Sequence, residues 1–316
     1  MTALSLRRPG SPARPRASKL AQRETRWALI FIAPWTIGFL AFTLIPMIAT
    51  LVFTVTSVSL SQDEPLRFVG LDNYASMLKD QQTWDSLGVT LRFALFALPV
   101  GVLAPLSAAL LLNNRRLKAS GLFRVLFFMP YVVPFVAGVL IWLTMLNPEG
   151  GWLDDFLRLL GVADPPNWLH DQTWIYPGLV LVGIWGIGGG MIVYLAGLRG
   201  VPSELYDAAR IDGAGAWASF RNVTLPLISP VILYSLVLSI IDVLQYFLAP
   251  LVINQGTGEP GGTTSFLNLY IYKNFFAYQN MSYGATLAWL LFGITMLFTL
   301  LVFGTARRWV YYAGER

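Results

Sequence analysis

Long stretches without a single ionisable side chain divide this sequence, and they constrain its fold more than any other feature. A bilayer core of about 30 Å requires about 20 residues of α-helix, and six stretches reach that length. They cover residues 27–62, 93–114, 125–148, 172–198, 222–241 and 274–306. The fifth is interrupted by Asp242 and then continues uncharged to Gly258. We therefore predict an all-α integral membrane protein with six transmembrane helices.

The composition agrees with this prediction. Apolar residues make up 55% of the chain and charged residues only 12%, whereas a soluble domain carries about 25% charge. A membrane β-barrel is the competing architecture, because only helices and closed barrels satisfy their backbone hydrogen bonds in lipid. A barrel would show short segments of alternating polarity instead of long uniform runs. Prolines would also interrupt its ladder, while membrane helices tolerate them. They occupy positions 34, 46, 99, 105, 130 and 134.

Lysine and arginine residues indicate the orientation. Seven precede Trp27, four separate the second and third runs, three separate the fourth and fifth, and three follow the sixth, which is 17 of the 22. Because positively charged segments stay in the cytoplasm, we expect both termini to be cytoplasmic. The predicted organisation is a basic, disordered tail over residues 1–26, a six-helix domain over 27–306 and a C-terminal tail over 307–316.

The excess of basic residues has a simple explanation in this topology, because they meet anionic membrane lipid on the cytoplasmic side. No nucleic-acid-binding motif accompanies them, so we predict no nucleic-acid partner. The apolar run after the basic tail is too long for a signal peptide, and no cleavage signature follows it.

Catalytic and metal-binding side chains are scarce. The chain has no cysteine and one histidine, His170, which excludes thiolate nucleophiles, cysteine-ligated metals and histidine clusters. His170 stands beside Asp171 in a predicted outer loop, where the pair is either a pH-sensitive switch or simply solvated. A membrane-embedded hydrolase would need paired catalytic groups, which the spans lack. We predict that the chain is not an enzyme and holds no catalytic residue or metal.

The second outer loop, residues 147–173, contains an amphipathic pattern. Apolar residues from Trp152 to Leu160 alternate with Asp154, Asp155 and Arg158. This pattern predicts a short helix that lies at the membrane interface.

The inner segment 199–226 carries charged and small residues in a helical pattern. Ser203 is a candidate N-cap, and Glu204 and Asp207 fall near the positive end of the helix dipole. Gly213 is expected to end the helix. A short helix outside the membrane has no core of its own, so we expect it to dock on a partner. The predicted docking residues are Glu204, Leu205, Tyr206, Asp207, Ala208, Ala209, Asp212 and Gly213.

This inner segment resembles the EAA loop of ABC-importer permeases, in which Glu-Ala-Ala is followed by three residues, a Gly and finally a Leu-Pro. The chain supplies Asp207-Ala208-Ala209, Gly213 and Leu225-Pro226, with Asp in place of Glu and hence a carboxylate of shorter reach. Other stretches are similar to the maltose-type and glycerol-phosphate-type branch of type I ABC importers, and the similarity covers about residues 27–306. Of the two permeases that such systems encode, the chain resembles the first. The stretches are Val69–Tyr74, Asn167–Leu169 and the Gly/Thr-rich loop before Tyr270.

The resemblance implies a transmembrane domain of the type I ABC-importer class in a bacterial cell membrane. The partners it implies are a second permease, a pair of ATPase subunits, an external solute-binding protein and a sugar substrate. ATP and Mg²⁺ would be bound by the ATPase subunits, so no cofactor is expected in this chain. A phosphate-binding G-x-x-x-x-G-K-[ST] loop is indeed missing from the sequence. Gly188–Gly190 lies inside a span, where small residues let helices approach each other closely.

Asp242 is the one ionisable residue within the predicted spans. A charge at this depth costs about 2.5–3.5 kcal/mol on insertion scales, so it should face a cavity or a partner. Ser239, Asp242 and Tyr246 are spaced to share one helix face, and a carboxylate, a hydroxyl and an aromatic ring suit a sugar site. The predicted substrate-pathway residues are Trp185, Gly186, Ser239, Asp242, Gln245 and Tyr246.

Two alternatives remain open for Asp242. It could make a structural hydrogen bond to the partner permease or to a carbonyl freed near Pro250. It could also be the coupling carboxylate of an ion-driven secondary transporter, although such carriers show repeated halves with matching broken helices.

Overall fold

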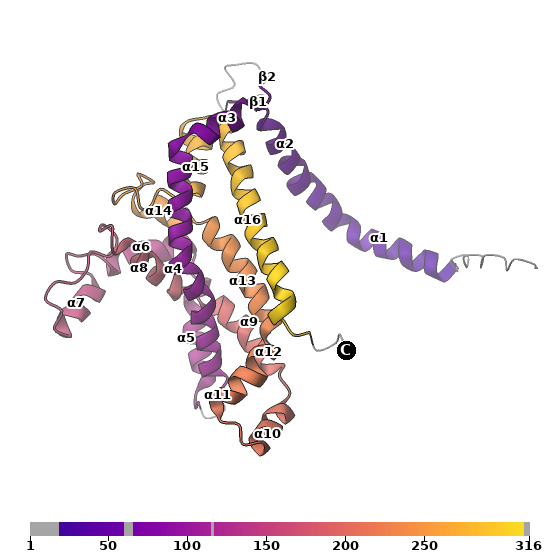
Figure 1. Cartoon of the computed structure of the whole chain (residues 1–316), viewed down its shortest axis with the longest axis vertical. Helices are drawn as coiled ribbons and strands as arrows, with labels where there is room; N and C mark the ends of the chain where they lie inside the picture. Colours follow the sequence, from indigo (N-terminus) through magenta and orange to yellow (C-terminus); the bar gives the residue numbers. More distant parts are fainter. Residues whose placement is uncertain (1–18, 60–65, 115–116, 313–316) are drawn as a thin grey trace, which may run out of the picture. The chain divides into compact units, whose positions relative to one another are not determined.

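The computed structural model describes residues 19–59, 66–114 and 117–312 and shows a helical protein (Figure 1). It divides into two units, residues 1–52 and 53–316. Several sequence predictions fall outside the described residues: the disordered tail up to residue 18, the end of the first uncharged run, two of the basic residues between the second and third runs, and the last four residues of the C-terminal tail.

The first unit is built from α1 (Lys19–Phe39), a π-helical turn η1 (Leu40–Leu44) and most of α2 (Ile45–Phe53). The part of the predicted tail between residues 19 and 26 is helical, because α1 starts before the apolar run. Pro34 lies inside α1 without ending it. Residues Arg23–Phe53 form one helix that is long and apolar enough to cross a membrane.

Three long helices form the centre of the second unit. They are α4 (Gln81–Leu112), α13 (Ser229–Leu244) and α16 (Met281–Trp309). Helix α13 packs against both α4 and α16, and Figure 1 shows the three side by side. A short helix, α14 (Leu248–Ile253), extends α13 to a span of Ser229–Ile253. These helices account for three further membrane spans.

Two pairs of bent helices are together also long and apolar enough to cross a membrane. The pair α5 (Ser120–Val132) and α6 (Phe135–Met145) bends by 102°, and the pair α8 (Ile175–Trp185) and α9 (Gly188–Arg199) bends by 59°. With each bent pair counted as one span, they and the four unbroken helices give the predicted number of six. At the first bend Val133 is extended, with ψ of 130°, because the residue before a proline avoids helical geometry. The second bend falls at Gly186 and Ile187.

The glycine triplet at the start of α9 allows the close approach that the sequence predicts. A Cβ atom at Gly188 would collide with the backbone of Phe127 in α5. A Cβ atom at Gly189 would lie 2.7 Å from the ring of Tyr131, and one at Gly190 would lie 3.2 Å from Pro105. The missing side chains at these positions let α9 pack closely against both α5 and α4.

One end of the second unit carries a short antiparallel pair of strands, β1 (Thr56–Ser57) and β2 (Arg67–Phe68), with Thr56 opposite Phe68. Helix α3 (Asp72–Lys79), helix α15 (Leu267–Tyr272) and the π-helical turn η3 (Lys273–Ala277) lie at the same end (Figure 1). The opposite end carries α10 (Ser203–Ile211) and α11 (Ala216–Ser219), followed by the π-helical turn η2 (Phe220–Thr224) and α12 (Leu225–Leu227).

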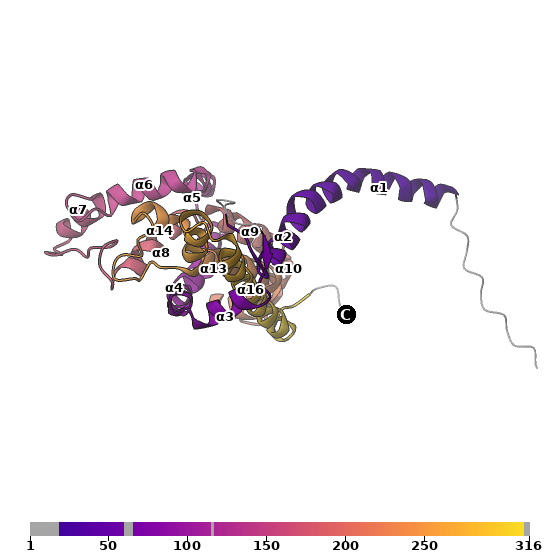
Figure 2. The same ribbon diagram turned by 90° about the horizontal axis from the view of Figure 1, so that it is seen from above.

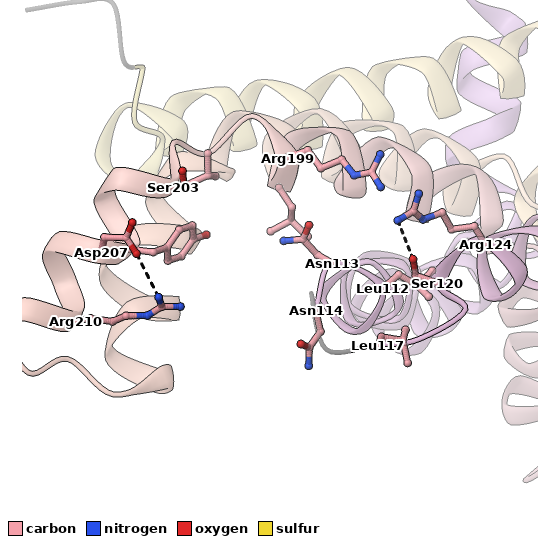
Figure 3. A pocket seen from close by; sticks show the side chains of 13 residues that line it. Leu112, Asn113, Asn114, Leu117, Ser120, Arg124, Arg199, Ser203, Asp207 and Arg210 are labelled. Atoms are coloured by element: carbon pink, nitrogen blue, oxygen red, sulfur yellow. Dashed lines mark hydrogen bonds and ion pairs between the residues drawn. The ribbon is translucent and has the colours of Figure 1, made fainter.

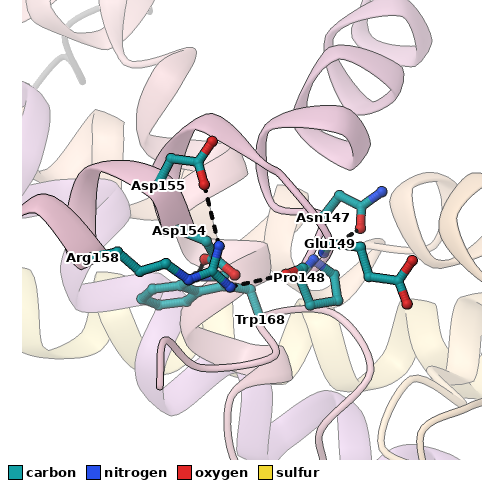
Figure 4. Close-up of polar contacts among 7 residues, drawn as sticks. All are labelled: Asn147, Pro148, Glu149, Asp154, Asp155, Arg158 and Trp168. Carbon is teal, nitrogen blue, oxygen red and sulfur yellow. Dashed lines mark hydrogen bonds and ion pairs between the residues drawn. The ribbon is translucent and has the colours of Figure 1, made fainter. Parts of the chain in front are cut away.

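Helix α7 (Trp152–Leu159) confirms the amphipathic helix predicted in the second outer loop, and in Figure 2 it follows α6 along one side of the unit. Its buried face is fixed by Asp154, which is 1% exposed and accepts a hydrogen bond of 3.0 Å from Nε1 of Trp168 (Figure 4). Trp152, Phe156 and Leu159 are exposed on α7. An exposed apolar face of this kind fits the predicted place at the membrane interface, which stays a prediction.

Candidate functional site

Helix α10 forms where the inner docking helix was predicted, although it starts differently. Ser203 is its first residue, the preceding position is Pro202, and no side chain caps the helix. The predicted N-cap role of Ser203 is therefore wrong, because Pro202 takes the flanking position. Glu204 in the first turn and Arg210 in the last have the charge signs that favour the helix dipole.

The end of α10 depends on Gly213, as predicted. Gly213 adopts a left-handed backbone with φ of +78°. Its N–H donates to the carbonyl of Arg210 at 3.0 Å, and the N–H of Ala214 donates to the carbonyl of Ala209 at 2.8 Å. These two bonds satisfy carbonyl groups that the helix leaves free at its end. The left-handed backbone thus explains why glycine occupies this position of the motif.

We expect Gly213→Ala to loosen the end of α10, because a left-handed L-residue costs about 1–2 kcal/mol. Amide exchange in α10 should become about fivefold faster or more. The matched control is Gly215→Ala, since Gly215 has an ordinary extended backbone and open space around its Cβ position. Equal exchange in the two variants would contradict this role of Gly213.

The outer face of α10 and the turn after it are open to solvent. Glu204, Leu205, Asp207, Ala208, Asp212 and Gly213 are exposed, and Ala209 is half-buried. Nearby, Ile211 is 87% exposed and Trp217 of α11 is 71% exposed. Large apolar side chains in this setting, beyond the ends of the spans, indicate a surface for a partner.

Asp207 forms an ion pair with Arg210, with 3.2 Å between Oδ1 and Nη1, on the exposed side of α10 (Figure 3). The two side chains are 66% and 75% exposed. Exposed pairs three residues apart stabilise a helix by only a few tenths of a kcal/mol. The carboxylate of Asp207 therefore remains available to a partner at little cost to α10.

A single side-chain hydrogen bond links α10 to the start of the fifth span. The hydroxyls of Tyr206 and Thr224 lie 2.9 Å apart. Thr224 is buried and ends η2, and Leu225, Pro226 and α13 follow directly. Tyr206 was predicted as a docking residue, but Thr224 was not, because only the fold brings the two together.

A cavity of about 420 Å³ lies against the middle of α13. It brings together three of the predicted pathway residues, Gly186, Ser239 and Asp242. Sequence reasoning missed its other polar groups, which come from three different helices, α5, α9 and α13. These are Tyr131, Tyr194, Tyr234 and Ser235.

The other three predicted pathway residues lie elsewhere. Trp185 lines an adjoining cavity of about 430 Å³, which also contains Gly186. Gln245 and Tyr246 line neither cavity, because α13 ends at Leu244 and the chain leaves the shared helix face. The ring of Tyr246 instead packs 4.9 Å from that of Phe93, and the backbone carbonyl of Gln245 accepts a hydrogen bond from Asn268.

Asp242 makes no hydrogen bond or ion pair with any other residue in the described ranges. A structural bond from Asp242 to a carbonyl near Pro250 is therefore not formed within this chain. The carboxylate is exposed to the cavity. In a membrane a free carboxylate requires a ligand, water or a partner chain.

Asp80 joins several elements at the end opposite α10, and sequence reasoning missed it. Its carboxylate accepts hydrogen bonds from the hydroxyls of Thr83, Tyr270 and Tyr283 and from the N–H of Gln82, at 2.6–3.0 Å. Burial alone would raise the pKa of Asp80, but these hydrogen bonds outweigh it and hold the pKa below its ordinary value. Burial and the neighbouring Asp80 charge raise the pKa of Tyr270 to about 12.

We expect Asp80→Asn to lower the free energy of unfolding by about 1 kcal/mol, because the amide is a weaker and less versatile acceptor. The carboxylate has a lower pKa in the folded protein, so its contribution is complete above pH ~4 and disappears as the pH falls further. Thermal unfolding should show that the stability difference between the wild type and Asp80→Asn is smaller at pH 3.5 than at pH 7. The control is Asp85→Asn in α4, the helix that Asp80 caps; the carboxylate of Asp85 accepts one exposed bond, so this variant should change little.

Within the described residues no group of three His, Asp or Glu side chains could hold a metal ion. The notable sites are thus an exposed docking helix, a link to the fifth span and a polar cavity against that span. Together with the membrane-spanning helices they are typical of a component of a membrane transporter.

Comparison with known proteins identifies the family. Residues 83–313 match the family of binding-protein-dependent transport system inner membrane components, and the chain belongs to it. It is 32% identical to the trehalose/maltose transport system permease protein MalF of Thermococcus litoralis over 92% of this chain and 97% of the relative. It is also 32% identical to the lactose transport system permease protein LacF of Rhizobium radiobacter, over 88% and 93%.

A bacterial ABC transporter that imports the polysaccharide alginate has the same fold in a crystal structure. The TM-score is 0.75 at 23% identity, over 92% of this chain and 99% of that chain. The resemblance to ABC-importer permeases is thereby confirmed, and the chain is a permease component of a cell membrane. Membership of this family replaces the alternative of an ion-driven secondary transporter.

Proposed function

We propose that this chain forms one half of the pathway through which an ATP-driven importer carries a sugar or an oligosaccharide. Relatives named for trehalose/maltose and lactose transport support this substrate class. The cavity against α13 supports it as well. Its tyrosine rings suit the apolar faces of a sugar, and its hydroxyls and the Asp242 carboxylate suit sugar hydroxyl groups.

The proposed complex contains a second permease, a pair of ATPase subunits and an external solute-binding protein, in a bacterial cell membrane. ATP and Mg²⁺ belong to the ATPase subunits in this arrangement, and the missing phosphate-binding loop in this chain agrees with it. We place α10 and both termini in the cytoplasm, because 17 of the 22 lysine and arginine residues fall on that side.

The observation that carries the proposal is the continuous path from α10 to the cavity. An ATPase subunit bound to the exposed face of α10 would move Tyr206 when it closes. The Tyr206–Thr224 hydrogen bond would transmit that movement to the start of the fifth span. Helix α13 would then shift Ser239 and Asp242 in the cavity wall. ATP-driven closure of the ATPase pair would thus switch the pathway between outward and inward access.

Reconstitution of the whole transporter tests this function. Proteoliposomes with both permeases, the ATPase pair and the binding protein would be given a panel of labelled disaccharides and oligosaccharides. We expect uptake that needs internal ATP and persists when the proton gradient is dissipated. Uptake without ATP that follows the proton gradient would overturn the proposal.

We expect Tyr206→Phe to reduce the number of sugars transported per ATP about threefold to tenfold, since it removes one hydrogen bond of about 1 kcal/mol from the link. Thr224→Val removes the other partner. If the bond transmits movement, the double variant should be no worse than either single variant, as in a double-mutant cycle. Fully additive losses would show that the two hydroxyls act separately.

A further inference from the structure

A second cavity, of about 490 Å³, lies between α10 and the junction of α4 with α5 (Figure 3). Its lining is mainly polar and positively charged. Arg124, Arg199 and Arg210 line it, and Asp207 is the one carboxylate among the lining residues. Asp207 is already paired with Arg210. The cavity therefore has a net positive charge with no acidic group left to balance it.

Arg124 and Arg199 lack an acidic partner among the described residues. Nε of Arg124 is buried without a hydrogen-bond acceptor, and its Nη2 makes a long bond of 3.4 Å to Ser120. Figure 3 shows Arg124 and Arg199 on the same side of the cavity, across from the Asp207–Arg210 pair. Two guanidinium groups that line one cavity without an acidic partner leave positive charge that an anion can balance.

Two helices also begin at this cavity. Ser120 is the first residue of α5, Ser203 is the first residue of α10, and both line the cavity. Neither helix has a side-chain cap. Uncapped helix starts present free N–H groups and a partial positive charge, which favour a phosphate group.

The position of the arginines indicates where the anion comes from. Arg124 immediately precedes the third uncharged run and Arg199 immediately follows the fourth, so both lie at the level where a bilayer has its headgroups. Leu117 adds apolar surface to the lining, which suits the start of an acyl chain. Basic pockets between membrane helices on the cytoplasmic side bind anionic phospholipid headgroups.

We propose that this cavity binds the phosphate of one anionic phospholipid, such as phosphatidylglycerol, between Arg124 and Arg199. Because Ser203, Tyr206 and Asp207 form the opposite wall, the bound lipid would also fix the position of α10. Coupling to ATP hydrolysis would then depend on anionic lipid, a consequence that rests on the proposed function and orientation. Lipid binding itself does not rest on the function.

The test measures lipid binding directly. The purified wild-type protein in nanodiscs of phosphatidylcholine would receive increasing phosphatidylglycerol, and native mass spectrometry and thermal unfolding would be recorded. We expect one retained phosphatidylglycerol and a higher unfolding temperature. The variant Arg124→Gln/Arg199→Gln should bind it roughly 30-fold more weakly, from the loss of two arginine–lipid contacts.

The matched control is Arg221→Gln/Arg308→Gln, which removes two exposed arginines outside the cavity and should keep the lipid. Arg124→Lys/Arg199→Lys keeps the charge and should bind more tightly than the glutamine variant, which separates lost binding from misfolding. If the control variant lost as much lipid binding as Arg124→Gln/Arg199→Gln, the lipid would be held by diffuse surface charge and not by this cavity. If inorganic phosphate raised the unfolding temperature as much as phosphatidylglycerol does, the cavity would be a site for free anions. If the ATPase subunits displaced the lipid, the cavity would be part of a protein interface. Each of these results overturns the proposal.

Discussion

Replacement of Asp207 by Arg should abolish ATP-driven uptake while leaving the chain folded and inserted. Asp207 lies on the exposed face of α10, and its only described partner is Arg210 on the same helix. Charge reversal costs α10 little, because the ion pair is exposed. At an interface with an ATPase subunit, however, a like-charge contact costs several kcal/mol. We expect uptake and sugar-stimulated ATP hydrolysis to fall at least 30-fold.

Co-purification of the ATPase subunits with the Asp207→Arg variant measures the cause directly. The matched control is Glu24→Arg, which reverses one exposed charge on the proposed cytoplasmic side and outside α10. That variant should assemble and transport like the wild type. Normal ATPase capture and uptake by Asp207→Arg would remove the docking role of α10.

The number of spans could be predicted from charge alone, but their bends could not. Pro99 and Pro105 lie inside the continuous 32-residue α4, whereas Pro134 separates α5 from α6 at an angle of 102°. The local sequence disfavours a helix before every proline. Packing decides whether the helix continues: α4 packs along both α9 and α13, and its neighbours can support the freed backbone groups.

The site was predictable where its signal is local. Gly213 and the docking residues belong to one helix, and Asp242 stands out as a single charge in an uncharged run. The spacing argument wrongly grouped Tyr246 with Asp242, because it assumed that α13 continues beyond Leu244. Asp80 was missed because its partners Tyr270 and Tyr283 are 190 and 203 residues away in sequence. Contacts between residues so far apart cannot be inferred from a single sequence.

The substitution Asp242→Asn should reduce sugar uptake about 10- to 100-fold, because hydrogen bonds to a charged acceptor are worth about 1.5–3 kcal/mol. Asn keeps the size of the side chain and removes the charge, so the fold should persist. ATP hydrolysis without sugar should stay near the wild-type rate, since Asp242 lies in the cavity and not on α10. The measurement is sugar-stimulated ATP hydrolysis together with uptake in proteoliposomes.

Tyr246→Phe gives the sharpest comparison for Asp242. The two residues are four positions apart, and the sequence assigned both to the pathway, but the ring of Tyr246 packs among Phe93 and Phe266 away from the cavity. Tyr246→Phe removes only a hydroxyl and should leave uptake unchanged. Ser239 lines the cavity, so Ser239→Ala should reduce uptake a few fold. A functional Asp242→Asn transporter with an impaired Tyr246→Phe variant would place the sugar against the aromatic cluster instead. The order of the three effects therefore decides which side of the fifth span faces the substrate.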